Sequence, residues 1–169
     1  PLSLQARALL AASFALAAFL GLAGFALDQA IYGALRNALH DRLQRYVYGY
    51  LAGSDTSRGG KLIPPELPPD PRFNQPSSGL YAGVIGEKNR WLSPSAIGKE
   101  LPFEVQLKPN ETSFDGPLET EVGRVYRLSL GVSYEVPNRG LVPLTFHVAE
   151  DAAVLEAQLE VFRDTLLIH

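Results

Sequence analysis

Four carboxylates gather in the stretch from residue 111 to residue 121, and oxygen ligands of this kind suit hard cations such as calcium or magnesium. They are Glu111, Asp115, Glu119 and Glu121. Their spacing matches no calcium-binding loop, and a calcium site needs about six or more converging oxygens. We therefore keep the four as candidate ligand-sensing residues, expect a solvated acidic loop, and predict no metal site.

The three histidines of the chain are the next candidates for chemistry. His147 falls on the polar side of an alternating strand pattern, where an imidazole that titrates near neutral pH can report acidity. We keep His147 as a candidate sensing residue, although an ordinary surface histidine is the favoured interpretation. His40 lies off the apolar stripe of a helix, and His169 lacks the acidic neighbour and the helix pair of a phosphoacceptor. Scattered histidines without cysteine give little support for a metal site.

Several other chemistries are excluded by composition and motif. The chain has no cysteine, which removes disulfides and thiolate metal sites, and its net charge of −3 gives no reason to expect nucleic acid as a partner. It contains no G-x-S-x-G elbow, and the glycines at 59 and 60 lack the flanking pattern of a phosphate loop. We therefore expect neither catalytic residues nor a bound cofactor in these 169 residues.

A membrane anchor is indicated by residues 8–27, which carry no charged side chain. At about 1.5 Å per residue such a helix spans the roughly 30 Å hydrocarbon core. Arg7 before it and Asp28 after it favour an N-terminus inside the cell and the remainder outside. A cleaved signal peptide usually has a shorter apolar region, and an all-round apolar surface argues against a soluble core helix.

The helical pattern does not stop at the end of the apolar segment. Ile31, Leu35, Leu39 and Leu43 recur at four-residue spacing, which predicts that the membrane helix continues as one amphipathic helix to about residue 52. We predict that this face packs against a sheet and transmits the signal. Turn-forming residues follow at 53–60, and the proline-rich stretch 64–76 predicts an extended surface loop.

Strand patterns occupy the second half of the chain. Residues 79–86 and 90–92 predict one hairpin, residues 124–136 and 142–148 predict a second, and residues 103–107 predict a further strand. Strict alternation in the second hairpin predicts one face on a core and the other toward water. Three aromatic side chains are candidates for a ligand pocket, but core packing is the favoured interpretation: Tyr81, Trp91 and Phe103.

A C-terminal helix completes the predicted α+β fold. Asp151 is suited to cap it, and apolar residues recur along one side at Leu155, Leu159, Phe162 and Leu166. We expect the chain to be part of a longer protein, because it lacks methionine even at position 1 and ends without a signal that stops the helix.

Three segments carry a resemblance to one family. They are residues 1–10 (PLSLQARALL), residues 80–94 (LYAGVIGEKNRWLSP) and residues 144–166 (LTFHVAEDAAVLEAQLEVFRDTL). In this order the chain resembles the N-terminal membrane and sensor region of PhoQ-type bacterial two-component sensor histidine kinases. The resemblance implies a PAS-like periplasmic domain, with a central antiparallel sheet and flanking helices, held between two helices of the inner membrane.

The resemblance also implies a domain division and a set of partners. Residues 1–27 would be a cytoplasmic stub and transmembrane helix, residues 28–162 the sensor domain, and residues 163–169 the start of a segment leading to a second transmembrane helix. A homodimer, a cognate response regulator, and ATP with Mg for a kinase domain outside these residues are expected. Magnesium sensing is not carried over, because the acidic stretch at 111–121 is diluted by proline and apolar residues.

Two other classes remain open, and the signal itself is not predicted. One is a chemoreceptor-type protein with a similar outer domain and no kinase. The other is a single-span envelope protein that acts as a binding module. The sequence that follows residue 169 would separate these classes from a kinase.

Overall fold

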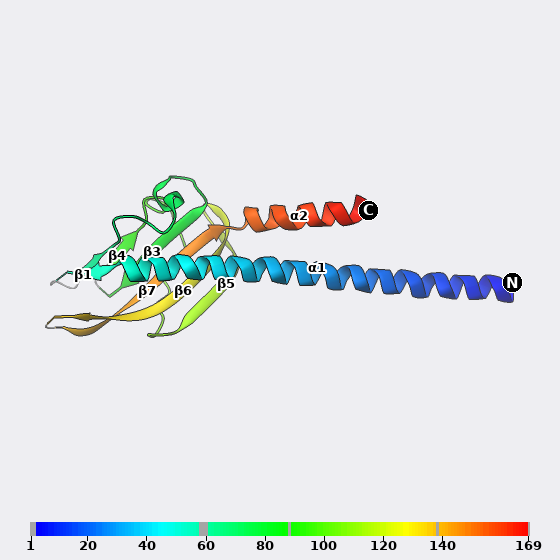
Figure 1. Ribbon diagram of the computed structural model, residues 1–169, viewed down its shortest axis with the longest axis horizontal. Helices are drawn as coiled ribbons and strands as arrows, with labels where there is room; N and C mark the ends of the chain where they lie inside the picture. The colour runs from blue at the N-terminus through cyan, green and yellow to red at the C-terminus, as the bar shows by residue number, and fades with distance from the viewer. Residues whose placement is uncertain (1–2, 58–60, 88, 138, 169) are drawn as a thin grey trace.

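The computed structural model describes residues 3–57, 61–87, 89–137 and 139–168 and has the predicted α+β architecture (Figure 1). Its elements, in chain order, are α1 (Leu4–Gly53), β1 (Asp55–Thr56), β2 (Leu62–Ile63), the 3-10 turn η1 (Pro71–Asn74), β3 (Leu80–Gly86), β4 (Arg90–Leu92), β5 (Thr112–Thr120), β6 (Gly123–Val136), β7 (Gly140–Asp151) and α2 (Ala153–Ile168).

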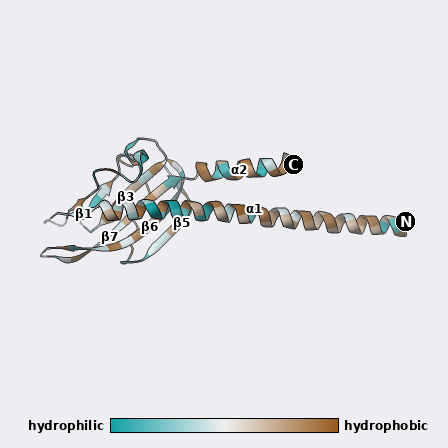
Figure 2. Ribbon diagram, viewed as in Figure 1, coloured by the Kyte–Doolittle hydropathy of each residue, from teal (hydrophilic) through white to brown (hydrophobic). Residues whose placement is uncertain are grey.

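Helix α1 is a single helix of 50 residues that begins in the apolar segment and ends beside the sheet. The Ser3 side chain accepts a hydrogen bond from the Ala6 amide at 3.2 Å and so caps its first turn. Its N-terminal half extends away from the sheet and is mostly apolar (Figure 2). The helix is long and apolar enough to cross a membrane. The prediction that the apolar segment and the amphipathic segment form one helix is confirmed.

The five larger strands form one antiparallel sheet in the order β4-β3-β7-β6-β5. Both predicted hairpins are present, and the β6–β7 hairpin is the longer, with pairs from Val125–Asp151 to Val136–Gly140. The short strands β1 and β2, which the sequence analysis did not predict, pair with each other at the C-terminal end of α1. Helix α2 leaves the sheet from the end of β7 and runs toward the N-terminal side of the molecule (Figure 1).

One face of the sheet is covered by the C-terminal half of α1. The helix buries four side chains, namely Leu39, Leu43, Val47 and Tyr50. Leu43 is fully enclosed. The four meet apolar side chains from the three central strands, namely Leu80, Ala82, Val84, Tyr126, Leu128, Leu130, Leu144, Phe146 and Val148. Burial of each leucine or valine contributes about 1.5–3 kcal/mol, so this part of α1 belongs to the domain core.

The opposite face of the sheet is also covered, by the segment 93–107. Ala96 and Phe103 from this segment are buried against Tyr81, Val125 and Ala149. As a result, β6 and β7 are buried on both faces in their middle portions, and the prediction of a water-facing side is wrong. Alternation alone does not reveal an irregular segment that packs over the polar side of a strand.

The strand predicted at 103–107 is also absent. Phe103 is buried, but the segment lies over the sheet without joining it. The Leu107 amide donates a hydrogen bond to the Thr145 hydroxyl of β7 at 3.0 Å. Gly131 of β6 lies beneath it, and a Cβ atom there would come within 2.2 Å of the Lys108 carbonyl oxygen. The absence of a side chain at Gly131 lets the two backbones approach each other.

Two further predictions need correction. The stretch from 111 to 121, predicted as a loop, contains the edge strand β5, whose register shifts between Asp115 and Leu118. Pro117 lies within this irregularity, where no ladder hydrogen bond is lost. The proline-rich stretch is not wholly on the surface either, because Phe73 is fully buried in edge-to-face contact with Tyr46 and Tyr50.

Helix α2 begins as predicted. The Asp151 carboxylate accepts a hydrogen bond from the Ala153 amide at 2.9 Å, which caps the first turn. Leu155 and Leu159 are buried, Phe162 is half-buried and Leu166 is exposed. The buried side chains of α2 therefore lie in its first two turns, and Phe162 is partly covered in the third.

Candidate signal-transmitting interface

A buried carboxylate joins α1 to the central strand at the end of the sheet from which α2 leaves. Glu150, near the end of β7, has a side chain only 3% exposed. Its Oε2 atom accepts hydrogen bonds from Arg42 Nη2 at 2.8 Å and Arg42 Nε at 3.2 Å. The Arg72 guanidinium lies 3.7 Å from the other carboxylate oxygen. Because two nitrogens of the Arg42 guanidinium donate to the same carboxylate, the contact fixes the orientation of the Arg42 side chain as well as its distance from Glu150.

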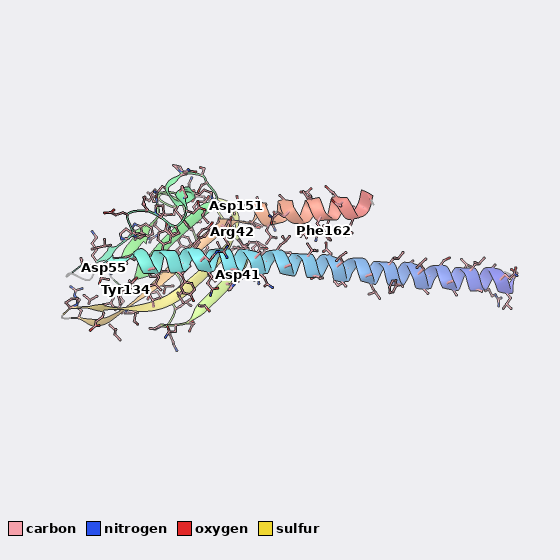
Figure 3. The ribbon with its side chains drawn as sticks, viewed as in Figure 1. Asp41, Arg42, Asp55, Tyr134, Asp151 and Phe162 are labelled. Atoms are coloured by element: carbon pink, nitrogen blue, oxygen red, sulfur yellow. The ribbon has the colours of Figure 1, made fainter. Side chains whose placement is uncertain are left out.

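The same region contains a second polar group that connects α1 to the proline-rich stretch. The Tyr46 hydroxyl donates to Asp70 Oδ2 at 3.0 Å and accepts from Arg72 Nη2 at 3.1 Å. Arg72 also binds the Asp70 carboxylate directly, and this hydrogen bond holds the pKa of Asp70 below its usual value. Together with Glu150 and Arg42, these residues connect α1, η1 and β7 in one network of hydrogen bonds and ion pairs. Arg42 is labelled in Figure 3.

Closer to the apolar segment, α1 contacts the edge strand β5 and its neighbour β6. The Tyr32 and Tyr126 hydroxyls lie 3.0 Å apart, and burial raises the pKa of the Tyr126 phenol. The Arg36 guanidinium lies 4.4 Å from the centre of the Phe114 ring, a cation–π geometry. His40 meets the same ring edge-on at 5.1 Å. These side chains extend the contact of α1 along the sheet toward its apolar N-terminal half.

The two helices are joined by an ion pair just beyond the apolar segment. Arg163 of α2 donates to both carboxylate oxygens of Asp28, at 2.7 and 2.9 Å. This bidentate contact holds the pKa of Asp28 below its usual value. The opposite end of α2 is tied to the sheet by the ion pair of Arg124 with Glu156. A displacement of α2 therefore acts on α1 at Asp28 and on β6 at Arg124.

The apolar residues predicted to pack on the sheet and to transmit the signal do pack on the sheet in the second half of α1, and their role in signalling stays a prediction. Leu39 and Leu43 are buried against the sheet, and Leu35 packs at the edge of the same core. Ile31 is half-buried, one turn nearer to the apolar segment. Sequence periodicity found these apolar contacts, whereas the polar contacts at Arg42 and Tyr46 carry no periodic signal.

His147 lies in the sheet interior, so the expectation of a surface histidine is wrong. It is 1% exposed, its ring stacks on Phe103 at 5.3 Å, and its Nδ1 atom lies 2.7 Å from the Ser129 hydroxyl. Burial above all, and then the charge of Arg127, lower the pKa of His147 to about 4, while the Val105 backbone opposes the shift. Its Nε2 atom has no hydrogen-bond partner of good geometry in the described part of the chain.

The four candidate acidic residues are not brought together. Asp115 accepts hydrogen bonds from the Ser113 hydroxyl and from Arg127, each at 2.7 Å, and these bonds lower the pKa of the Asp115 carboxyl. Glu111 immediately precedes β5, whereas Glu119 and Glu121 lie at the other end of the strand. The latter two line an open cleft of about 710 Å³ that Glu100 and Glu104 also border. No cluster of three or more metal-ligating side chains occurs among the described residues.

A second open cleft was not anticipated from the sequence. It has a volume of about 660 Å³ and lies between β2, the β3–β4 turn and the β6–β7 hairpin. Basic residues in the β3–β4 turn and in the β6–β7 turn were a sequence signal for this cleft, but the sequence pattern did not indicate that the two turns lie side by side.

Comparisons with protein-family models, with curated proteins and with solved structures find no match for the chain.

Proposed function

We propose that this chain is the extracytoplasmic sensing region of a bacterial two-component sensor histidine kinase, with a PAS-like domain in the periplasm and α1 in the inner membrane. The observation that carries the proposal is the continuity of α1. A helix apolar enough to cross a membrane runs without interruption into the core of the domain, where Leu39 and Leu43 are buried against the central strands.

The arrangement of the sheet supports the PAS-like assignment. The last strand, β7, lies at the centre between β3 and β6, and α1 crosses one face of the sheet. The central antiparallel sheet with flanking helices that the family resemblance implies is thus matched by the order and the coverage of the strands.

The proposed mechanism is a small shift of packed helices between two states. A signal that binds one state of the domain better than the other changes the balance between them. The shift acts on α1 through its apolar face and through the ion pair of Arg42 with Glu150, and on α2 through the end of β7. Helix displacements of about 1–2 Å are sufficient at such interfaces.

The remainder of the proposal rests on the family resemblance. The intact protein would work as a homodimer, use ATP and Mg to phosphorylate a histidine, and pass the phosphate to a response regulator. All of these activities belong to domains outside the 169 residues.

Membrane topology tests the proposed placement directly, because the chain contains no cysteine of its own. Gln5→Cys and Ala52→Cys place single thiols at exposed positions on either side of the apolar segment. In intact bacteria an impermeant maleimide should label position 52 and leave position 5 unlabelled until the cells are lysed. Equal labelling of both positions before lysis would contradict the proposal.

The reading frame after residue 169 tests the kinase assignment separately. A second apolar span followed by a phosphoacceptor-histidine helix and an ATP-binding domain supports it. A long coiled coil in their place would indicate a chemoreceptor, and an early stop codon without a second span would indicate a single-span binding module.

A further inference from the structure

The unanticipated cleft lies at the end of the sheet opposite to the start of α2, and we call it the distal cleft. Arg139 in the β6–β7 hairpin, Arg90 at the start of β4 and Lys61 beside β2 contribute to its lining. A hydrogen bond of 3.4 Å from the Leu62 amide to the Asn89 side chain joins two of its walls. In Figure 3 the labels of Asp55 and Tyr134 mark this end of the molecule. A volume of about 660 Å³ is of the size that holds a small organic ligand.

The charge of the distal cleft is positive. Three described cationic side chains line it, against one described carboxylate, Glu87. None of the three cations forms an ion pair with a carboxylate in the part of the chain that the structure describes. Most arginines elsewhere on the domain do have such a partner. Arg90 also borders the open cleft lined by Glu119 and Glu121, so Arg139 and Lys61 are the cations that line the distal cleft alone. Unpaired cationic groups in one cleft suit a carboxylate or a phosphate, which a guanidinium binds with two hydrogen bonds.

The distal cleft also has an apolar part. Trp91 lines it as the one tryptophan of the chain, beside Val142 and Pro143 of β7, and Leu141 is 71% exposed there. A large exposed leucine and an indole ring in the same cleft offer apolar surface for an aromatic or aliphatic body. A purely inorganic anion would leave this surface uncovered.

We propose that the distal cleft binds a small organic anion in which a carboxylate or phosphate group is attached to an apolar body. Arg139 and Lys61 take the anionic group, and Trp91 and Leu141 take the apolar body. Glu87 opposes the anionic group and limits the affinity.

Occupancy of the distal cleft has a direct route to α1. The Trp91 ring lies 5.4 Å from the Tyr50 ring, and Tyr50 in the last turn of α1 is 3% exposed and packs on Phe73. A ligand that moves the indole therefore acts on the packed end of α1. This step rests on the proposed function, whereas ligand binding in the cleft does not.

Binding is measured on the full chain in lipid nanodiscs, with the emission of Trp91 as the readout. Phenylacetate and phenyl phosphate are the two anionic probes, and phenylacetamide is the neutral control of the same shape. We expect a saturable change with at least one anionic probe, at an affinity about tenfold or more above that of phenylacetamide. Which anion binds more tightly identifies the head group. No saturable change with either anion at millimolar concentration, or equal affinity for phenylacetamide, would overturn the proposal.

Substitutions locate the binding site. Arg139→Ala should weaken binding of the preferred anion about tenfold, because one charge-assisted contact is lost, and Glu87→Gln should strengthen it. Arg45→Ala removes an exposed arginine of α1 that does not line the cleft and should leave the affinity unchanged. Equal weakening by Arg139→Ala and Arg45→Ala would show a general effect of charge and overturn the assignment to the cleft. Because topology is measured separately, failure here leaves the proposed function standing.

Discussion

At the scale of single residues, buried polar groups distinguish this domain from the expectation drawn from its sequence. His147 and Ser129 alternate with apolar neighbours, as a water-facing side would, yet both are fully buried. The covering segment 93–107 has a periodic pattern only at residues 103–107, where it predicted a strand, so the sequence offered no signal that these polar side chains would be enclosed. The apolar residues Leu39 and Leu43, by contrast, were placed correctly, because four-residue spacing has one simple structural meaning.

The burial of His147 predicts an acid-dependent loss of stability. Its pKa is about 4 in the folded protein and near 6.5 in an unfolded chain, so the unfolded state binds the proton first as the pH falls. The free energy of unfolding should therefore decrease through the window from about pH 6.5 to pH 4, by about 2 kcal/mol between pH 7 and pH 5. Denaturant titrations followed by Trp91 emission measure it.

The matched variant for this prediction is His147→Gln, which keeps an amide near the Ser129 hydroxyl and does not titrate. Its free energy of unfolding should change much less between pH 7 and pH 5. Asp70 and Asp115 have lowered pKa values, so their contribution to the free energy of unfolding is lost only at lower pH. They therefore do not change the stability between pH 7 and pH 5. An identical pH dependence in both proteins would show that His147 is not its source.

At the scale of elements, the contacts of α1 are a mixture of what pattern predicts and what it misses. Helix α1, both hairpins and the cap of α2 were predicted, because each has a local signal in spacing or in turn residues. Strand β5 was missed, since its register shift around Gly116 and Pro117 interrupts the alternation. The ion pair of Arg42 with Glu150 joins residues more than one hundred positions apart, and such a pairing has no local signature.

This ion pair should contribute measurably to the docking of α1. Arg42→Ala leaves the Glu150 carboxylate buried with Arg72 alone at 3.7 Å, and we expect the free energy of unfolding to fall by about 2 kcal/mol. The exposed residue Arg45 provides the control, because Arg45→Ala should change it by no more than about 0.5 kcal/mol. Thermal or denaturant unfolding of both variants measures the difference.

A double-mutant cycle isolates the pair itself. Glu150→Gln combined with Arg42→Ala should cost less than the two single changes added together, because each single change already removes the same contact. Additive effects would mean that Arg42 and Glu150 stabilise the domain independently of each other, and the network would then not couple α1 to β7.

At the scale of the whole molecule, the long axis is set by α1, which projects well beyond the sheet on the side toward which α2 also points (Figure 1). The domain is thus held at one end by two helices, joined by the ion pair of Asp28 with Arg163, and carries the distal cleft at the other. The fold topology is defined by the order of the strands in the sheet. Sequence pattern does not predict this order, because strand pairing depends on contacts between residues far apart in the chain.

The central claim is that α1 is one rigid helix from the lipid into the core, and an interspin distance measures this most directly. Labels at Phe14→Cys and Tyr48→Cys, both exposed on α1, are separated by 34 residues in a chain without other cysteines. In lipid nanodiscs a continuous helix predicts a single narrow distribution centred at about 50 Å. A broad distribution, or one with a distinct shorter component, would reveal a hinge near Gly21 or Gly24 and would contradict the rigid connection.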